Sequence, residues 1–568
     1  MSGPRVIPIV AASSPAMRER RRQGPRGRKP GEQALAEVRQ LLGDASRQSD
    51  LLIEHLHKLQ DHFGHLSAAH LAALAQEMRL AQSEVYEVAS FYHHFDIVKE
   101  GEDAPQALTV RVCDGLSCEL AGAQQLLEKL PALLGREVRV IPAPCIGRCE
   151  QAPAAVVGQN PVPCATPEKV AEKVREGAVV HEPEGYTGLS QYRAAGGYQL
   201  LEQCLSGERD VESIIKVMEA SGLRGLGGAG FPAGRKWRIV RAEAAPRLMA
   251  VNIDEGEPGT FKDRVYLERD PHRFLEGMLI AAWAVGIAKI FIYLRDEYHG
   301  CRTLLQQELA RLKADRLGTK LPEIELRRGA GAYICGEESA MIESIEGKRG
   351  MPRLRPPYVA QVGLFGRPTL EHNFETLYWV RDLVDHGPEW FASKGANGRK
   401  GLRSFSVSGR VREPGVKLAP AGVTIQELID EHCGGMAEGH QFYAYLPGGA
   451  SGGILPASMN HIPLDFDTLQ PYGCFIGSAA VMVLSEHDTA MGAARNLMRF
   501  FRDESCGQCT PCRAGTAKAL ALIAQPKWDV PLLAELSQVM RDASICGLGQ
   551  AAPNPVDCVV KYFPHELG

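Results

Sequence analysis

Apolar side chains recur at intervals of three to four residues through the first ordered part of the chain, for example at Leu35, Val38 and Leu42. That repeat places them on one face of a helix, and it continues with interruptions over residues 33–100. The pattern therefore predicts a small helical bundle.

The pattern changes near residue 105. Apolar and polar residues alternate over 109–112 and again over 138–141, which is typical of strands, and residues 122–134 between them form an amphipathic helix. This order predicts a compact α/β domain over residues 105–180. Residues 181–199, with Pro183, Gly185 and Gly188, are predicted to be a linker.

Three further regions follow. Residues 200–400 are predicted to be a larger α/β domain, residues 403–485 a section of strands and turns rich in glycine and proline, and residues 490–568 a helical region. The longest apolar run, residues 278–294, is interrupted by Lys289 and is too short to cross a bilayer. It predicts a buried helix that leads into a strand, in a multidomain protein of α/β and α+β class.

Length and composition fit a soluble multidomain protein. The 568 residues are 45% hydrophobic and 23% charged, with a net charge of −4, which favours neither a nucleic acid nor a membrane as partner. Residues 1–32 are basic and rich in Pro, Gly and Ser, so a disordered tail is predicted. No signal peptide is recognised, and a cytoplasmic location is expected.

Fifteen cysteines without an export signal indicate metal ligation rather than disulfides. Cys506, Cys509 and Cys512 form a CxxCxxC run, and Cys546 follows at a distance. Three closely spaced thiolates and a remote fourth are typical of a [4Fe–4S] cluster. Zinc is the alternative, although structural zinc sites usually pair two CxxC knuckles.

A second group of cysteines follows the two strands of the smaller α/β domain. Cys113 and Cys118 come after the first strand, and Cys145 and Cys149 after the second. Two pairs at adjacent strand ends suit a [2Fe–2S] cluster, with zinc again the alternative. The other cysteines are predicted to be buried thiols: Cys164, Cys204, Cys301, Cys335, Cys433, Cys474 and Cys558.

Residues 222–237 are dense in glycine and end with Arg235 and Lys236, a composition that lets backbone N–H groups approach a phosphate. Polar residues 252–264 follow an expected strand, and residues 329–339 precede an expected helix, so both lie where α/β proteins bind ligands. Residues 351–358 add cationic and aromatic groups suited to a nicotinamide nucleotide.

These segments, taken in order with the final cysteines, make residues 200–565 resemble the flavin-bearing, NADH-binding subunit of respiratory complex I. Residues 33–180 resemble the thioredoxin-like [2Fe–2S] subunit of the same systems.

The resemblance implies a β-grasp, soluble-ligand-binding domain over residues 403–485 and a [4Fe–4S] cluster in the last helical bundle. It implies FMN bound by Gly225, Gly227, Gly228, Lys236, Asn252, Asp254, Glu255 and Asn373. It implies NAD(H) bound by Phe231, Arg355 and Tyr358, with Glu257 and Glu338 acting on it.

Such fusions occur in soluble NAD-linked formate dehydrogenases and in NAD-reducing hydrogenases. Residues 362–370, 445–453 and 460–466 look closest to the β subunit of a formate dehydrogenase. The resemblance therefore implies an α subunit partner with molybdenum or tungsten and further iron–sulfur clusters, and electron transfer from formate to NAD⁺. The alternative is the diaphorase subunit of a NiFe hydrogenase. Leu226 stands where relatives commonly have arginine, and Arg355 and Tyr358 replace lysine and phenylalanine.

Overall fold

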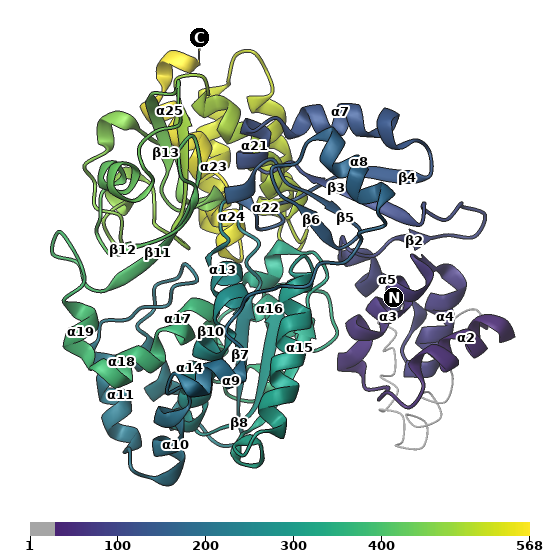
Figure 1. Cartoon of the computed structure of the whole chain (residues 1–568). Coiled ribbons are helices and arrows are strands. Elements are labelled where there is room, and N and C mark those ends of the chain that lie inside the picture. The colour runs from purple at the N-terminus through teal and green to yellow at the C-terminus, as the bar shows by residue number, and fades with distance from the viewer. Residues whose placement is uncertain (1–28, 568) are drawn as a thin grey trace, which may run out of the picture. The chain divides into compact units, whose positions relative to one another are not determined.

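The computed structural model describes residues 29–567, and the chain divides after Pro105 into two compact units. The basic segment predicted to be disordered lies almost entirely outside the described residues. The first unit packs short helices around Leu42, Leu56 and Leu74, and the Ser67 hydroxyl caps one of them by accepting the N–H of His70. These helices are α2 Glu32–Leu42, α3 Leu52–Phe63, α4 Ala68–Met78 and α5 Gln82–Phe91 (Figure 1).

The second unit begins with a sheet in the order β4-β3-β5-β6. The first pair, β3 Leu108–Cys113 and β4 Val138–Ala143, is parallel, whereas β5 Ala155–Val157 and β6 Asn160–Val162 are antiparallel to their neighbours. Helix α7 Ala123–Leu134 buries Leu126 and Leu130 in the core of this domain. The thioredoxin-like [2Fe–2S] domain of the expected fold class is therefore present.

The segment predicted to be a linker is partly helical. Helix α9 Leu189–Ala194 buries Tyr192, whose hydroxyl donates to Glu276 at 2.6 Å. Tyr198 is also buried and shares a 2.8 Å hydrogen bond with His272. These aromatic anchors fix the second half of the segment to α14 Pro271–Val285, although its first half is rich in proline and glycine.

A parallel sheet in the order β10-β7-β8-β9 forms the next domain. Its strands are β7 Arg247–Ile253, β8 Ile287–Leu294, β9 Glu323–Arg328 and β10 Thr369–Asn373. The apolar run of the sequence forms the second half of α14 and all of β8, as predicted, and α14 is buried along almost its whole length. Because all the strands are parallel, their carboxyl ends meet at one edge of the sheet, where α/β proteins bind ligands.

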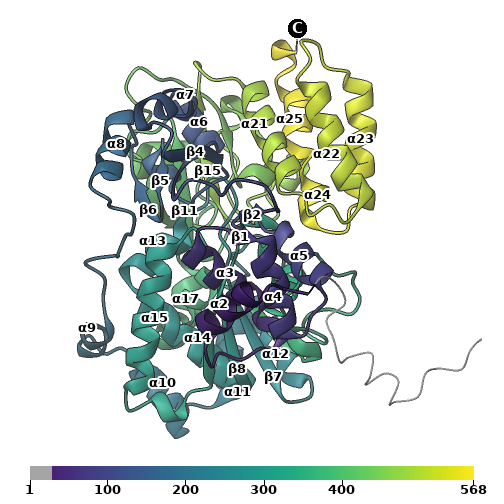
Figure 2. The same cartoon turned by 90° about the vertical axis from the view of Figure 1, so that its right-hand side faces the viewer.

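The chain then forms a mixed sheet in the order β12-β11-β15-β13-β14. Its strands are β11 Leu402–Gly409, β12 Gly415–Pro420, β13 Phe442–Leu446, β14 Leu455–Pro456 and β15 Ala480–Ser485. A C-terminal bundle closes the fold, with α22 and α23 adjacent in Figure 2. Its helices are α21 Ala490–Asp503, α22 Thr510–Ile523, α23 Val530–Ala543, α24 Gly547–Ala551 and α25 Asn554–Tyr562. The multidomain fold class predicted from the sequence is confirmed.

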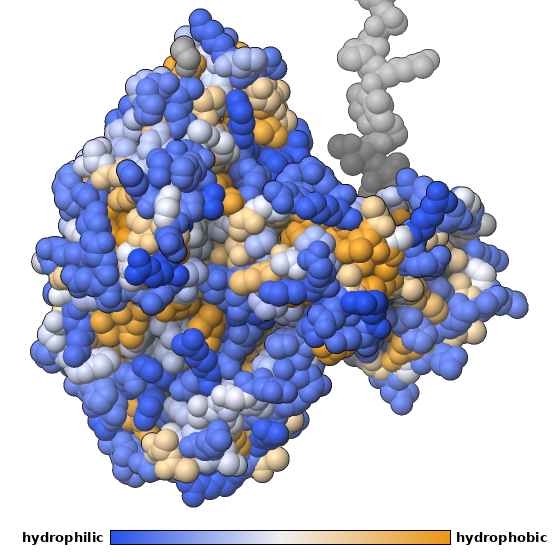
Figure 3. All heavy atoms as spheres, turned by 45° about the horizontal axis from the view of Figure 1, so that its top comes forward, coloured by the Kyte–Doolittle hydropathy of each residue, from blue (hydrophilic) through white to orange (hydrophobic). Residues whose placement is uncertain are grey.

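Within residues 29–567, no helix has the length and apolar character needed to cross a bilayer. The face shown in Figure 3 is mostly hydrophilic, with apolar residues in separate patches, which is the usual surface of a folded domain.

Candidate redox centres and flavin site

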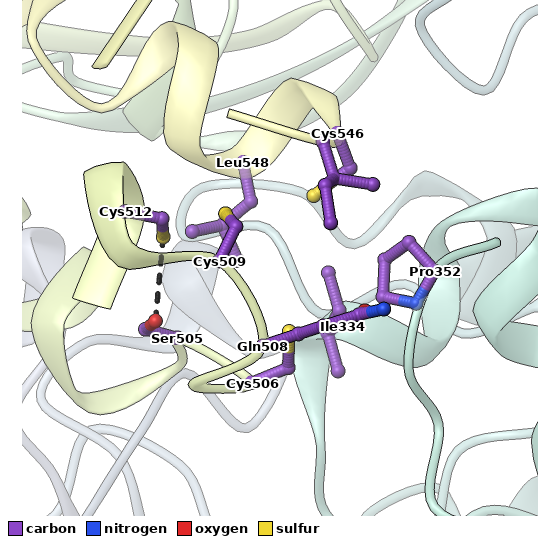
Figure 4. Close-up of a pocket in the computed structure, with 10 residues that line it drawn as sticks. Ile334, Pro352, Ser505, Cys506, Gln508, Cys509, Cys512, Cys546 and Leu548 are labelled. Carbon is purple, nitrogen blue, oxygen red and sulfur yellow. Dashed lines mark hydrogen bonds between the residues drawn. The ribbon is translucent and has the colours of Figure 1, made fainter. Parts of the chain in front are cut away.

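Four cysteines of the C-terminal bundle point into one small cavity (Figure 4). Cys506, Cys509 and Cys512 lie where α21 runs into α22, and Cys546 directly precedes α24. The rest of the lining is Ser505, Gln508 and the apolar side chains of Ile334, Pro352, Ile545 and Leu548. The predicted ligands therefore converge, although Cys546 is separated from the others by the whole of α23.

The surroundings of these thiols fit an iron–sulfur cluster. Burial raises the pKa of Cys512 to about 11 and that of Cys546 to about 12, so the bare thiols resist ionisation at neutral pH. A cluster supplies the positive charge that turns buried thiols into thiolate ligands. The Ser505 hydroxyl lies 3.3 Å from the Cys512 sulfur and is placed to donate a hydrogen bond to it.

The other predicted ligand group also converges. Cys113 is the last residue of β3, and Cys118, Cys145 and Cys149 join it in a fully buried cluster. The Sγ atoms of Cys145 and Cys149 are 3.4 Å apart, and none of these cysteines forms a disulfide. Two cysteine pairs facing one another are the ligand set of a [2Fe–2S] cluster.

Two buried arginines join this cysteine cluster to the next domain. Arg295 donates from Nη2 to the carbonyl of Cys145 at 2.6 Å, and from Nη1 to the carbonyl of Glu255. Arg264 donates from Nε to the carbonyl of Gly147 at 2.9 Å and forms an ion pair with Glu150. The thioredoxin-like domain is thereby held against the segment predicted to bind FMN. Arg295 was not predicted from the sequence, because it has no local motif.

The predicted FMN residues meet at the carboxyl ends of β7 and β10. Asn252 and Asn373 are paired in register on these strands, and Lys236 donates from Nζ to the carbonyl of Glu371 at 3.1 Å. We call Lys236, Asn252, Asp254, Glu371 and Asn373 the flavin cradle. Two of its carboxyl oxygens, Asp254 Oδ2 and Glu371 Oε2, are buried without a hydrogen-bond partner in the described structure.

Such orphaned acceptors are costly unless another group satisfies them, so the cradle fits a polar cofactor with N–H and O–H donors. Burial raises the pKa of both Asp254 and Glu371. In the glycine loop beside them, Gly227 leaves little room for a side chain, because a Cβ there would lie 3.0 Å from the Cβ of Asn373. Glu371 was not predicted, since a lone acidic residue in a strand has no sequence signature.

Two of the predicted FMN residues also make contacts within the protein. The Glu255 carboxylate accepts the N–H groups of Asp263 and Arg264 at 2.9 and 3.1 Å, and the Tyr298 hydroxyl at 2.8 Å. The Asn373 side chain caps α17 Phe374–Tyr378 by accepting the N–H of Glu375. Glu255 and Asn373 thus fix the ends of helices that border the cradle.

Glu257 connects two domains. Its carboxylate accepts the hydroxyl of Tyr333, and it accepts both the hydroxyl and, at 2.9 Å, the N–H of Ser451 in the β-grasp domain. Burial raises the pKa of Glu257. Ser451 was not singled out in the sequence.

The residues predicted to bind NAD(H) lie at the surface. Phe231 is 38% and Tyr358 55% exposed, so each has a ring available for stacking. Arg355 forms ion pairs with Glu337 and, at 3.0 Å, with Glu338. A polyanionic nucleotide can compete for the Arg355 guanidinium, because it is partly exposed and paired only with carboxylates.

The prediction that all remaining cysteines are buried is wrong for Cys164. It follows β6 in a turn and is exposed, whereas Cys204, Cys301, Cys335, Cys433, Cys474 and Cys558 are buried. Its neighbours Pro163 and Thr166 belong to that turn and not to an apolar strand face, which explains the difference.

Comparison with protein-family models matches the chain along most of its length. Residues 38–177 match the thioredoxin-like [2Fe–2S] ferredoxin family, and residues 218–382 match the Nuo51 FMN-binding domain. Residues 404–455 match the SLBB domain, and residues 492–568 match the NADH-ubiquinone oxidoreductase-F iron–sulfur binding region. The chain therefore has an FMN-binding domain, a [2Fe–2S] domain and a [4Fe–4S] region, in a family that binds NADH.

Known proteins agree with these matches. An NADH-quinone oxidoreductase subunit of Rhizobium meliloti is 40% identical over 402 residues, which cover 68% of this chain and 95% of that protein. The mitochondrial NADH dehydrogenase flavoprotein 1 of Dictyostelium discoideum is 40% identical over 62% of this chain and 78% of that protein. Among solved structures, an NAD⁺-reducing [NiFe]-hydrogenase in the H₂-reduced state superposes with a TM-score of 0.80, 33% identity and 92% coverage of both chains.

The predicted resemblance to complex I is thus confirmed, together with the cofactors FMN, [2Fe–2S], [4Fe–4S] and NAD(H), whereas the formate dehydrogenase assignment is not. The chain belongs to the 51 kDa family of NADH-binding FMN subunits of complex I, and it is an oxidoreductase subunit with an additional thioredoxin-like [2Fe–2S] domain.

Proposed function

We propose that this chain is the NAD⁺-reducing diaphorase subunit of a soluble formate dehydrogenase, in complex with an α subunit that holds molybdenum or tungsten and further iron–sulfur clusters. The short helix η4 Tyr333–Gly336 is the main support for the diaphorase part of this proposal. Ile334 lines the cavity of the [4Fe–4S] ligands, while the carbonyl of Gly336 accepts Asn252 of the flavin cradle at 2.9 Å. One turn of chain therefore borders both redox sites.

The roles of the side chains follow from this arrangement. Lys236, Asn252 and Asp254 would hold the flavin, together with the backbone of Gly225, Gly227 and Gly228. Phe231 and Tyr358 would stack on the nucleotide, and Arg355 would bind its phosphates. Glu257 and Glu338 would position the nicotinamide. When bound, FMN supplies the conversion between two-electron hydride transfer with nicotinamides and one-electron transfer with clusters.

Formate is proposed as the electron donor because residues 362–370, 445–453 and 460–466 resemble formate dehydrogenase β subunits. Dihydrogen is the second candidate, favoured by the superposition on the NAD⁺-reducing [NiFe]-hydrogenase chain over 92% of both chains. Either donor is oxidised in a partner subunit, so the sites of this chain serve both. The proposal includes a cytoplasmic location, since buried cluster thiols suit a reducing compartment.

The test is metal analysis of the native complex, isolated anaerobically through this chain from its source cell. Molybdenum or tungsten, together with formate-dependent NAD⁺ reduction, is the expected result. Nickel with H₂-dependent NAD⁺ reduction would replace formate with hydrogen as the donor. A complex without NADH–ferricyanide activity would contradict the diaphorase function itself.

A further inference from the structure

A second cavity lies between the glycine loop and the β-grasp domain. Its volume is about 250 Å³, enough for a small metabolite. Its lining comes from the glycine loop, from chain between residues 391 and 403 before and within β11, from residue 421 after β12 and from the turn at residues 465–466.

This cavity is separate from the predicted cofactor sites. None of the residues predicted to bind FMN, NAD(H) or a cluster lines it. It meets the glycine loop at Leu226, whose N–H is already bound by the Thr376 hydroxyl at 2.9 Å. A ligand in this cavity would therefore occupy a new site.

The lining is strongly cationic. Arg224, Arg399, Lys400 and Arg403 face a single lining carboxylate, that of Asp465. Asp465 is shared, because it pairs with Arg399 at 2.7 Å and also with Arg403. Arg224 pairs with Asp467 just outside the lining, and within residues 29–567 Lys400 has no hydrogen bond or ion pair. Positive charge thus exceeds negative charge around the cavity.

Arg403 is the clearest sign of a missing anion. Its side chain is only 4% exposed, and its Nε has no hydrogen-bond partner in the described part of the chain. Burial lowers the pKa of this guanidinium, because removing the charged group from water costs free energy. A buried donor of this kind is stabilised when an anion accepts its hydrogen bond.

The aromatic side chains limit the kind of ligand. The guanidiniums of Arg224 and Arg403 lie over the ring of Phe466, 4.4 and 4.3 Å from its centroid. Phe391 is 2% exposed and packs against Gly401, where a Cβ would lie 2.2 Å from the ring. Neither ring offers an open face to a nucleobase, so the cavity suits a compact ligand whose binding energy comes from charge.

We propose that this cavity, between the glycine loop and the β-grasp domain, binds a small polyanion through Arg399, Lys400 and Arg403. Phosphorylated and polycarboxylate metabolites share this chemistry. Arg403 would donate to the anion from its unpartnered Nε. Arg399 uses Nε on Asp465 and Nη2 on the carbonyl of Phe466, so it would donate from Nη1, and the exposed Lys400 would add a point charge.

Calorimetric titration of the full chain, loaded with FMN and clusters, tests the site. The probes are inorganic phosphate, pyrophosphate and citrate, in low salt and with saturating NAD⁺ so that the nucleotide site is filled. One probe at least is expected to bind with a 1:1 stoichiometry. Binding of phosphate or pyrophosphate alone identifies a phosphoryl ligand, and binding of citrate alone identifies a polycarboxylate.

Two variants separate this cavity from general surface charge. Lys400→Ala removes an exposed, unpaired cation and is expected to weaken binding about fivefold or more. Lys527→Ala removes an exposed lysine of the C-terminal bundle and should leave the affinity unchanged. Ala421→Leu narrows the cavity without changing its charge and should also weaken binding. Absence of binding by all three probes, or equal affinity of Lys400→Ala and the parent chain, would overturn the proposal.

Discussion

At the residue scale, Glu257 is held by donors from two directions, and this determines how a substitution should act. Tyr333 donates from the cradle side and Ser451 from the β-grasp domain. Replacement by glutamine keeps the shape but removes the charge and turns one acceptor oxygen into an NH₂ group, to which the Tyr333 hydroxyl can no longer donate. Such a mismatch costs about 1–3 kcal/mol when it is buried.

Glu257→Gln is therefore expected to lower kcat/KM for NADH oxidation by roughly tenfold, about 1.4 kcal/mol, while FMN stays bound. NADH–ferricyanide kinetics and the flavin released on denaturation measure the two effects. Glu431→Gln, at an exposed glutamate of the β-grasp domain, is the control. Unchanged kinetics in Glu257→Gln would remove Glu257 from the nucleotide site.

Glu255 leads to a pH prediction. Burial raises its pKa to about 7 from the ordinary value of 4.5, so the folded protein holds a proton that the unfolded chain has released. Stability from this group is present below pH 4.5 and is lost as the pH rises to about 7. The loss amounts to at most about 3 kcal/mol.

Glu255→Gln should therefore show a smaller fall in Tm between pH 5 and pH 7.5 than the parent chain, as measured by thermal unfolding under anaerobic conditions. The Glu431→Gln variant, at an exposed position, is again the matched control, and its Tm is expected to fall with pH as much as that of the parent chain. An identical fall in Glu255→Gln and the parent would show that Glu255 does not titrate in this range.

The limits of sequence reasoning are clearest for individual residues. The two groups of four cysteines could be predicted to converge, because each group has a spacing typical of metal centres. Arg295, Ser451 and Glu371 could not be predicted, since they act through partners distant in the chain. Arg295, for example, binds the carbonyl of Cys145, 150 residues away.

At the scale of elements, α7 lies within one residue of the helix predicted over residues 122–134. The strands β7 and β8 and the helix α16 Glu338–Ile345 lie where a strand before residue 252, a strand in the apolar run and a helix after residue 339 were expected. Helix α9 was not predicted, because Gly188 and the preceding proline and glycine residues indicate a linker. Its helical state depends on the hydrogen bond from the Tyr192 hydroxyl to Glu276 in α14. Tertiary contacts of this kind leave no periodic signal.

The helix α13 Lys262–Arg269 is the element that holds the [2Fe–2S] domain in place. Its Arg264 is 2% exposed and binds Gly147, Glu150 and Glu268. Arg264→Met keeps much of the side-chain volume but leaves Glu150 and the Gly147 carbonyl without their donor. Removing one partner of a buried ion pair typically costs about 3–5 kcal/mol.

Arg264→Met is expected to loosen this interface, so limited proteolysis should cut faster between residues 176 and 188, before α9. Arg269→Met, at the end of the same helix, is the control and should be cut at the parent's rate. Equal rates in Arg264→Met and the parent would mean that other contacts fix the domain.

At the scale of the molecule, the [2Fe–2S] domain distinguishes this chain from the NADH-quinone oxidoreductase relatives. The match to the Rhizobium meliloti relative covers 68% of this chain and 95% of that protein. The match to the hydrogenase chain covers 92% of this chain and 92% of that chain. The FMN-binding, β-grasp and C-terminal domains are thus the counterpart of nearly all of the Rhizobium meliloti relative, and the thioredoxin-like domain is added to them.

This architecture predicts that the added domain can lose its cluster without loss of the diaphorase reaction. Cys145→Ser removes one of the four buried cysteines predicted to hold the [2Fe–2S] cluster, while every predicted FMN and NAD(H) residue and all predicted [4Fe–4S] ligands remain. The [2Fe–2S] EPR signal should disappear, the [4Fe–4S] signal should stay, and NADH–ferricyanide activity should remain within about twofold of the parent.

Cys164→Ser, at the exposed cysteine of the same domain, controls for the chemical change and should keep both signals. A persisting [2Fe–2S] signal in Cys145→Ser would refute the ligand assignment, and a lost ferricyanide reaction would show that the added domain supports the flavin site through the Arg295 contact.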